Sequence, residues 1–261
     1  MVRFTLYLTL FLTSLVTAFM AHDSTVGDLA NGAVISLIIP LADAAMANRI
    51  NVRHVWYSAR YARRDVRISA AYLFKIKIDG KYLLVQGRRF PQLQPVGGVY
   101  KTSPSGGSFL ASIGARDDSL IPLDDRSIND LRIRIKGSQI PKFYTWFDSR
   151  AGREDSPWRE FHEELISTGI LSADKFPFTF QDYVRREVDP MRYSEHAESL
   201  EILIADIYEL LPTPAQEEAL RQLASTNISE VSWVTEETIR RRGVLPNGTV
   251  LTVAQHARRV I

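Results

Sequence analysis

The sequence contains no cysteine among its 261 residues. This absence excludes disulfide bonds, thiolate catalysis and every zinc site that is built on cysteine. Histidine is also scarce, because only five histidines occur and they are scattered without the spacing of a metal-binding motif. A metal site based on cysteine or on clustered histidines is therefore not expected.

The sequence also lacks an excess of charge of either sign. Its 32 basic and 30 acidic residues leave a formal net charge of +2. No global polyanion-binding surface is implied, so a nucleic-acid polymer is not expected as a partner. Apolar residues make up 45% of the chain, which is enough for one substantial domain and an additional segment.

Two apolar stretches lie near the N-terminus. Residues 4–21 carry no charge, and residues 29–47 are mostly apolar. A helix that crosses a bilayer needs ~20 apolar residues, so both stretches qualify by length. The sequence therefore predicts a transmembrane hairpin over residues 1–48. The alternative is a cleaved signal peptide followed by a buried helix.

The charges around the two stretches predict an orientation. The loop between them carries Asp23 and Asp28 and no basic residue, whereas residues 49–66 form a basic juxtamembrane linker. The positive-inside rule then places both ends of the chain in the cytoplasm. Asp43, in the second stretch, either faces a partner or a water-filled path, or reaches the interface from the cytoplasmic end.

Residues 67–261 have the pattern of an α/β domain with short strands. The dipeptide Asp79-Gly80 separates two apolar runs and predicts a β-hairpin. The strands are expected at residues 68–78, 82–87, 131–137, 200–210 and 230–234.

The other segments of this domain are assigned from weaker patterns. Residues 143–147 are aromatic and form a further strand candidate, while residues 104–107 and 189–196 are predicted as loops. Residues 213–224 are compatible with a helix or a loop, and a short helix is expected to start at Thr235.

A helix is predicted between Ser156 and Gly169. Ser156 is suited to the N-cap and Pro157 to the first helical position, where its missing N–H has no cost. Gly169 is suited to the left-handed conformation that ends a helix. Between them, Trp158, Phe161 and Leu165 recur at helical spacing as an apolar stripe.

Three carboxylates share a second face of this helix. Glu160, Glu163 and Glu164 lie at i, i+3 and i+4. Like charges at this spacing repel one another, which indicates a cation between them. Mg²⁺ prefers such oxygen ligands together with phosphate oxygens, so these three residues are the predicted metal ligands. The plain alternative is an amphipathic helix with a solvated acidic face.

The segment Arg159-Glu160-Phe161-His162-Glu163-Glu164, which is followed by Gly169-Ile170, resembles the second half of the Nudix box. The sequence Pro95-Val96-Gly97-Gly98 after an apolar strand is similar to the entry of that box. The resemblance covers roughly residues 66–261. It implies an α-β-α sandwich with a mixed sheet, in which the Gly97-Gly98 backbone lies close to ligand phosphates.

This sequence departs from the Nudix box in three ways. Ile166 and Ser167 are additional residues before the glycine, and residues 99–150 form an insertion that splits the box. The position eight residues before Arg159, where the family carries another glutamate, is Ala151. Glu154 would replace that glutamate only with a gap, which weakens any expectation of the usual hydrolysis.

The apolar hairpin, the split box and the aromatic, basic insertion together resemble the SMODS-associated Nudix proteins. These belong to bacterial cyclic-oligonucleotide-based antiphage signalling systems (CBASS). The resemblance implies that the soluble domain senses a cyclic nucleotide messenger, after which homo-oligomers of the membrane helices disrupt the inner membrane. Polar residues such as Asn31 and Asp43 would then line an assembled path.

A cyclic nucleotide needs aromatic rings for stacking and cations for its phosphates. Besides Gly97 and Gly98, the candidate ligand-binding residues are Tyr144, Trp146, Arg185, Arg186, Arg192, Tyr193 and His196.

Hydrolysis is the alternative function. An anchored, Mg²⁺-dependent Nudix hydrolase of nucleoside diphosphate derivatives would use Arg159 and the three glutamates, with Glu201 or Asp206 as a further ligand or base. The plainer interpretation of Asp206 is a surface acid at a strand end. A third candidate is an anchored Nudix protein without a signalling role.

Overall fold

The computed structural model describes residues 2–88, 90–118, 127–195, 197–226 and 228–261. The chain divides into two compact units. The first comprises residues 1–64 and 136–145, and the second comprises residues 65–135 and 146–261. The predicted insertion at residues 99–150 is therefore shared, because its residues 136–145 belong to the first unit and the rest belongs to the second.

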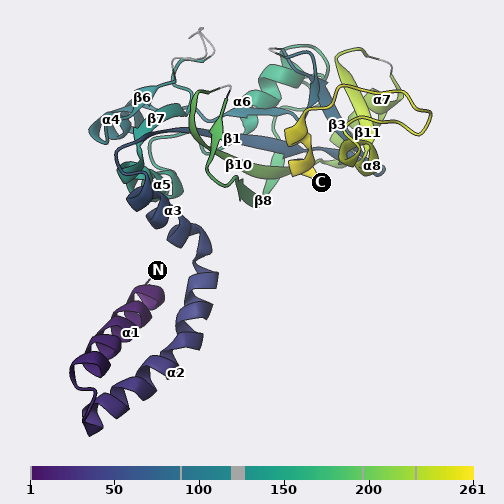
Figure 1. The fold of residues 1–261 in the computed structure, drawn as a ribbon. Coiled ribbons are helices and arrows are strands. Elements are labelled where there is room, and N and C mark those ends of the chain that lie inside the picture. Colours follow the sequence, from purple (N-terminus) through teal and green to yellow (C-terminus); the bar gives the residue numbers. More distant parts are fainter. Residues whose placement is uncertain (1, 89, 119–126, 196, 227) are drawn as a thin grey trace. The chain divides into compact units, whose positions relative to one another are not determined.

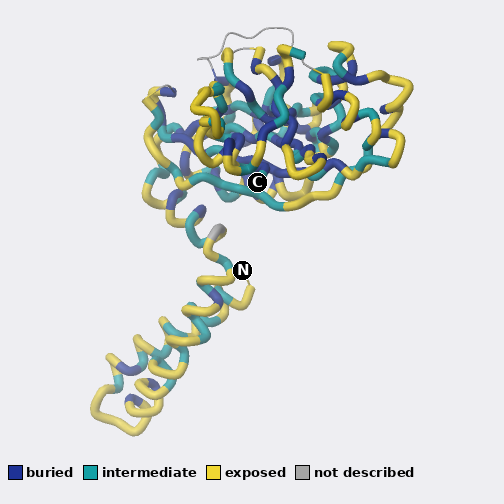
Figure 2. Tube along the Cα trace, turned by 90° about the vertical axis from the view of Figure 1, so that its right-hand side faces the viewer, coloured by how far each residue is buried: buried dark blue, intermediate teal, exposed yellow. Residues whose placement is uncertain are grey.

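An antiparallel pair of helices dominates the first unit (Figure 1). Helix α1 (Val2–Met20) and helix α2 (Thr25–Ala47) are both long and apolar enough to cross a membrane. Their side chains are mostly exposed or half-buried, as Figure 2 shows, whereas the core helix of a soluble protein would be mostly buried. The two predicted apolar helices are thus confirmed as helices, and the second begins four residues earlier than expected.

The predicted linker at residues 49–66 is largely helical. Helix α3 (Arg49–Arg60) packs against the short 3-10 helix η1 (Gly137–Gln139) and the start of α5 (Ile140–Ser149). The rings of His54 and Tyr144 stack with their centroids 3.6 Å apart, and the Gly137 amide donates to the Arg64 carbonyl at 2.9 Å. These contacts explain why the end of the insertion folds with the N-terminal segment.

The larger sheet of the second unit has a mixed topology. Its central strands β1 (Asp65–Lys75) and β10 (Ser199–Leu211) are parallel, whereas β8 (Phe180–Val188) pairs antiparallel with β10. The order along the sheet is β6-β7-β1-β10-β8. The remaining strands are β5 (Gly97–Val99) beside β1, β9 (Arg192–Ser194) beside β10, β6 (Arg116–Asp117) and β7 (Arg132–Lys136).

A smaller sheet contains the predicted hairpin. Strands β2 (Lys77–Ile78) and β3 (Lys81–Gln86) are joined by Asp79 and Gly80, whose φ angles of +47° and +78° are those of a tight type I′ turn. Strand β3 also pairs with β11 (Val231–Thr235) and β4 (Leu93–Gln94).

Helices cover both faces of β1. The ring of Phe74 packs against Phe161 of α6 (Trp158–Phe161) with centroids 5.5 Å apart. The adjacent Leu73 belongs to a separate buried cluster with Ile239 of α8 (Glu236–Arg240) and Val260 of η3 (Gln255–Val260). Because neighbouring side chains of a strand point to opposite faces, β1 is the middle layer. The predicted α/β class, an α-β-α sandwich with a mixed sheet, is confirmed.

Residues 213–224, which the sequence left open between helix and loop, form most of helix α7 (Pro214–Ser225). Thr213 and Gln216 form a reciprocal capping box at its start. The expected helix start at Thr235 is also confirmed, because Thr235 Oγ1 accepts from the Thr238 amide at 3.2 Å.

Three local predictions were wrong. Residues 143–147 are helical within α5, because Phe143 and Phe147 lie four residues apart and are both fully buried on one helix face. Residues 104–107 begin helix α4 (Pro104–Ser112), with Ser103 as its N-cap. The predicted loop at 189–196 contains β9, which is formed by pairing with β10 and has no strong pattern of its own.

Candidate functional site

The acidic helix begins at Trp158, one residue later than predicted, with Pro157 instead of Ser156 at the N-cap position, and its end at Gly169 is as predicted. Ser156 Oγ accepts from the Trp158 amide at 3.3 Å, and Gly169 adopts φ +77° at the other end. After α6 the chain forms a π-helical turn, η2 (His162–Ile166), in which the Ser167 amide donates to the His162 carbonyl at 2.8 Å. A π turn takes one residue more than an α turn. It therefore accommodates part of the additional sequence before Gly169.

Arg159 lies among three carboxylates. Its Nε and Nη2 donate to the two oxygens of Glu154 at 3.1 and 3.2 Å, a bidentate pair. Its Nη1 donates to Glu160 at 2.8 Å and to Glu163 at 3.3 Å. Nη2 also donates to the Val99 carbonyl at 3.0 Å, which ties the helix to β5. Glu154, which the sequence admitted only with a gap, is therefore part of the site.

Burial raises the pKa of two of the glutamates. The pKa of Glu164 rises to about 8 because its carboxylate is largely removed from water, although the Gly97 amide donates to it at 3.0 Å. Burial also raises the pKa of Glu160, against the opposing charge of Arg159. Carboxylates that are desolvated in this way are stabilised by any additional cation.

The glycine pair lies directly beside these carboxylates. A Cβ atom on Gly98 would come within 1.9 Å of Glu160 Oε1. Gly97 adopts φ +152°, and a Cβ there would come within 2.2 Å of the Tyr72 carbonyl oxygen. Neither position accepts a side chain without rearrangement. The predicted proximity of Gly97-Gly98 to Glu160 and Glu164 is thus present, while contact with ligand phosphates stays a prediction.

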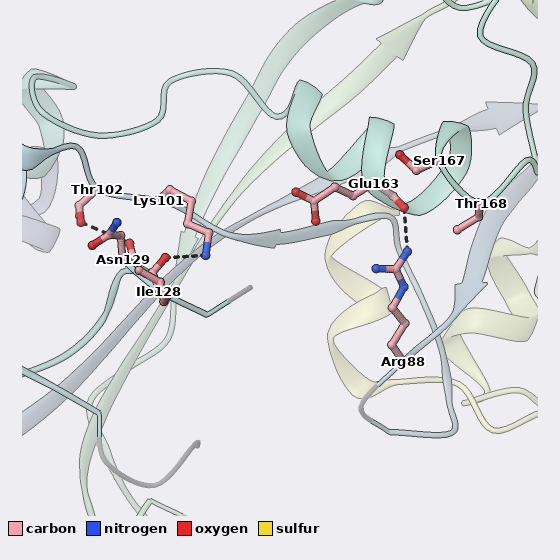
Figure 3. A pocket seen from close by; sticks show the side chains of 8 residues that line it. All are labelled: Arg88, Lys101, Thr102, Ile128, Asn129, Glu163, Ser167 and Thr168. Atoms are coloured by element: carbon pink, nitrogen blue, oxygen red, sulfur yellow. Dashed lines mark hydrogen bonds between the residues drawn. The ribbon is translucent and has the colours of Figure 1, made fainter. Parts of the chain in front are cut away.

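A polar cavity of about 750 Å³ opens next to the acidic helix. Figure 3 shows Glu163, Ser167 and Thr168 on the helix side, with Arg88 donating to the Glu163 carbonyl at 2.7 Å. Lys101 lies across the cavity and donates to the Ile128 carbonyl at 2.8 Å. The complete lining is Arg88, Lys101, Thr102, Ile128, Asn129, Glu163, Ser167 and Thr168.

A second cavity of about 560 Å³ shares Arg88 and Thr168 with the first. Glu164 lines it, together with the apolar side chains of Val85 and Ile170. Adjacent glutamates of one helix thus line two different cavities. The positively charged side chain of Arg88 lines both cavities.

The donor chemistry suits Mg²⁺, since Glu160, Glu163 and Glu164 offer only carboxylate oxygens. Among the residues that the structure describes, however, no group of three acids or histidines is arranged to hold a metal ion. The reason is visible in the ion pairs, because Glu160 and Glu163 both turn toward Arg159. Metal binding therefore requires these side chains to rotate away from Arg159.

The predicted arginines lie on the edge strands instead of at the acidic helix. Arg186 donates to Asp206 at 2.6 and 3.0 Å and also pairs with Asp148. Arg185 donates to Glu187 at 3.0 Å. Arg192 is exposed on β9.

The predicted aromatic residues are placed separately. Tyr144 is buried in the first unit against His54, and Trp146 stacks on Phe109 in the second unit at 5.3 Å. Tyr193 is 63% exposed on β9. His196 lies outside the described residues. None of the aromatic or arginine candidates lines either of the two cavities above, so their ligand contacts stay a prediction.

The two acids proposed as additional ligand or base are buried in ion pairs. Asp206 is only 1% exposed and accepts from the Tyr100 hydroxyl at 2.8 Å, so the interpretation as a surface acid is wrong. Parallel pairing with β1 and antiparallel pairing with β8 enclose this part of β10. Glu201 is buried beside Arg67.

Sequence reasoning missed the cavity residues Arg88, Lys101 and Asn129. The place of Arg88 in the site could have been predicted from the sequence, because Arg88 follows the strand that leads into the box. Lys101 and Asn129 could not have been predicted in the same way. An isolated β-bridge between Lys101 and Asp130 brings them together, and these residues are far apart in the sequence.

Comparison with known proteins gives one clear result. Residues 65–261 match the model of the family described as SMODS-associated NUDIX domain. Among curated proteins, none matches this chain. The matched range contains the acidic helix, the glycine pair and both cavities, and it covers about three quarters of the sequence. The chain therefore belongs to the SMODS-associated NUDIX domain family.

Proposed function

We propose that this protein is a membrane-anchored effector of a CBASS-type antiphage system. Its Nudix domain binds a cyclic nucleotide or oligonucleotide messenger, and its helical hairpins then assemble and disrupt the inner membrane. Family membership suggests a CBASS-type effector with a nucleotide messenger as partner. The two N-terminal apolar helices suggest membrane anchoring.

The observation that carries this proposal is the fusion of two unlike parts in one chain. A SMODS-associated Nudix domain follows two exposed apolar helices, with only the short helix α3 between them. A domain that only hydrolysed a soluble nucleotide would have no physical need for a spanning hairpin. A messenger drives assembly only if the assembled state binds it more tightly than the separate chains do. The domain is cytoplasmic in this proposal, because the basic residues follow α2.

The ligand site in this proposal is the pair of cavities beside the acidic helix. Arg88 and Lys101 supply the cations that phosphate oxygens need. Gly97 and Gly98 line neither cavity, so contact of their backbone with phosphate requires Glu160 to move away from Gly98. Lys101 is shared with Asp130 at 2.6 Å, so phosphate would compete with that carboxylate. Tyr193 and Arg192 remain accessible for stacking and for charge.

Nudix domains generally use a divalent metal, commonly Mg²⁺. In this chain Glu160, Glu163 and Glu164 would hold it, after release from Arg159. A bound Mg²⁺ neutralises phosphate charge and lowers the pKa of bound water. Arg159 would keep its ion pair with Glu154, and its bond to the Val99 carbonyl would keep the helix on β5.

Hydrolysis of nucleoside diphosphate derivatives is the second candidate function. The observation in its favour is Glu154, which joins Glu160 and Glu163 as a third carboxylate at Arg159 despite the altered spacing of the box. If this candidate is correct, the same residues Arg159, Glu160, Glu163 and Glu164 serve catalysis. The anchor would then only locate the enzyme.

The test is binding and turnover measured in the same sample. The full chain in lipid nanodiscs is incubated with cyclic di- and trinucleotides or linear nucleoside diphosphate derivatives, with and without Mg²⁺. Thermal shift reports binding, and chromatography reports products. Stabilisation by a cyclic nucleotide that is recovered intact supports the effector. Turnover of a linear compound without cyclic-nucleotide binding overturns it in favour of the hydrolase.

A matched pair of variants localises the effect. Replacing Glu160, Glu163 and Glu164 with glutamine removes the proposed metal ligands. Replacing three exposed glutamates elsewhere with glutamine removes the same charge, and the positions are Glu195, Glu218 and Glu237. Loss of Mg²⁺-dependent binding in the first variant alone is expected. Equal behaviour of the two variants would mean that the acidic face is merely solvated.

A further inference from the structure

Helix α3 is unusually rich in one charge. Between Asp43 and Asp65 the sequence contains five arginines and no acidic residue. Such a segment repels other cations and attracts anionic surfaces within the Debye length, about 8 Å at physiological salt. The charge is local, since the whole chain carries a formal net charge of only +2.

Two opposite faces of α3 differ in what they contact. His54 and Tyr57 are buried, and His54 stacks on Tyr144 of α5. The opposite face carries Val55 and Trp56, which are 51% and 55% exposed. A large indole that is half exposed to water is costly, so this face calls for a partner with apolar character.

The exposed arginines border this apolar surface. At 100° per residue, Arg49 and Arg60 lie within a narrow sector next to Trp56, and both are exposed. The guanidinium of Arg60 lies 5.4 Å from the ring centroid of Tyr61, and Arg60 forms no ion pair with a carboxylate among the described residues. An apolar surface edged by arginines is typical of helices at a membrane surface.

The position of α3 in the chain restricts where it can act. Helix α2 ends at Ala47, and Asn48 leaves the helical conformation with φ −111° and ψ 21° before α3 begins at Arg49. The headgroup layer is roughly 5–7 Å thick on each side of the hydrocarbon core. If α2 crosses the bilayer, the first turns of α3 necessarily lie in or next to the headgroups.

We propose that α3 is a membrane-surface helix that binds anionic phospholipids. Arg49 and Arg60 pair with headgroup phosphates, while Val55 and Trp56 occupy the boundary between headgroups and acyl chains. Guanidinium groups suit phosphate through bidentate hydrogen bonds, and tryptophan favours this boundary. The proposal rests on the membrane anchoring alone and is independent of the messenger.

The absence of cysteine permits a direct test. The full chain carrying Val55→Cys is labelled with a nitroxide and reconstituted in vesicles of phosphatidylcholine with phosphatidylglycerol. A label at exposed Asn247, introduced as Asn247→Cys in the Nudix domain, is the matched control. Accessibility to oxygen, which enters the bilayer, and to a water-soluble nickel chelate is measured for each. The Val55 label is expected to be shielded from nickel and open to oxygen.

The second arm tests the lipid charge. Brominated phosphatidylglycerol or brominated phosphatidylcholine is used to quench a fluorophore at Val55→Cys in the mixed vesicles. A basic residue at an anionic surface contributes a preference of about fivefold. Arg49→Gln with Arg60→Gln should therefore lower the preference for phosphatidylglycerol by about this factor or more. The control Arg240→Gln with Arg241→Gln removes the same charge at the C-terminal end of α8 and should leave the lipid preference unchanged.

Two results would overturn the lipid contact. One is a Val55 label that is as accessible to nickel as the Asn247 label, in chains that float with the vesicles and resist carbonate extraction. Such chains would be anchored in the membrane although α3 does not lie at its surface. The other is a label shielded from both oxygen and nickel, which would mean that protein covers this face. A cyclic nucleotide can still bind in either case, so the outcome does not depend on the effector function.

Discussion

Two of the arginines in the second unit, Arg159 and Arg186, are held by carboxylates that differ in their access to water. Arg159 pairs with Glu154, Glu160 and Glu163, of which Glu163 is 38% exposed and lines a cavity. Arg186 pairs with Asp206, whose side chain is 2% exposed, and with Asp148, whose side chain is 57% exposed. The same chemistry can thus be structural in a closed cluster, that of Arg186 with Asp206, and exchangeable in an open one, that of Arg159 with Glu163.

The physical reason is the cost of an unpaired charge. Removing one partner of a buried ion pair leaves a charge without compensation, at ~3–5 kcal/mol, whereas an exposed pair contributes ~0–1 kcal/mol because water replaces the partner. A phosphate or a metal ion can therefore compete for the ions around Arg159. It cannot readily displace Asp206 from Arg186, which also lies 4.6 Å over the ring of Phe147.

The largest expected effect is that of Asp206→Ala. The substitution leaves Arg186 with Asp148 alone and deprives the Tyr100 hydroxyl of its acceptor. The free energy of unfolding should fall by about 3–5 kcal/mol. Thermal and denaturant unfolding of the protein measure this change, with Asp182→Ala on the exposed part of β8 as the control. If Asp206→Ala lowered the free energy of unfolding no more than the control does, the closed cluster would not be more structural than the open one.

Gly98→Ala should act mainly on the open cluster. The new Cβ would collide with the Glu160 carboxylate and displace it from Arg159. Overpacking of this kind costs about 1–3 kcal/mol. Nucleotide or Mg²⁺ affinity should fall more than stability does, as calorimetric titration would show.

Gly107→Ala is the matched control for that substitution. Gly107 is exposed in α4 and has open space around it, so alanine should stabilise the helix by roughly 0.5–1 kcal/mol and leave binding unchanged. If Gly98→Ala also left binding unchanged, the glycine pair would not be part of the binding site.

The free energy of unfolding should also depend on pH through Glu164, which lies on the same helix as the open cluster. Burial raises the pKa of Glu164 to about 8, above an unfolded value of about 4.3. The folded state then binds a proton that the unfolded state has released. Stability should therefore fall as pH rises between about 4 and 8. The effect is limited, because the Gly97 amide and the charge of Arg88 favour the ionised form.

Glu164→Gln should abolish this part of the pH dependence without Mg²⁺. Stability curves of the two proteins in EDTA, measured from pH 5 to pH 9, provide the comparison. Saturating Mg²⁺ should flatten the curve of the unmodified protein, because a cation favours the ionised carboxylate. The same slope in both proteins would contradict the assignment to Glu164.

The smallest change in stability is expected for Glu163→Gln. Its carboxylate is partly solvated and its ion pair with Arg159 is long, so the free energy of unfolding should change by less than about 1 kcal/mol. Binding of nucleotide in the presence of Mg²⁺ should nevertheless weaken. A destabilisation equal to that of Asp206→Ala would mean that the open cluster is also structural.

Local sequence patterns predicted much of the fold. The turn at Asp79-Gly80, the end of the acidic helix at Gly169 and the long strand β10 are all specified within a few neighbouring residues. Prediction failed where distant contacts decide the conformation. The aromatic residues Phe143 and Phe147 favour a strand by propensity, but burial on one helix face overrides that preference.

The sequence by itself determined the two apolar helices, the acidic face of Glu160, Glu163 and Glu164, and the position of the glycine pair in the box. Spacing along the chain is sufficient for such features, because helical periodicity and backbone freedom act over a few residues. Only the tertiary structure decided that Glu154 reaches Arg159, that Asp206 is enclosed, and that Arg88 and Lys101 line one cavity. Those contacts join segments far apart in the chain, and burial between strands, which no local pattern encodes, brings them together.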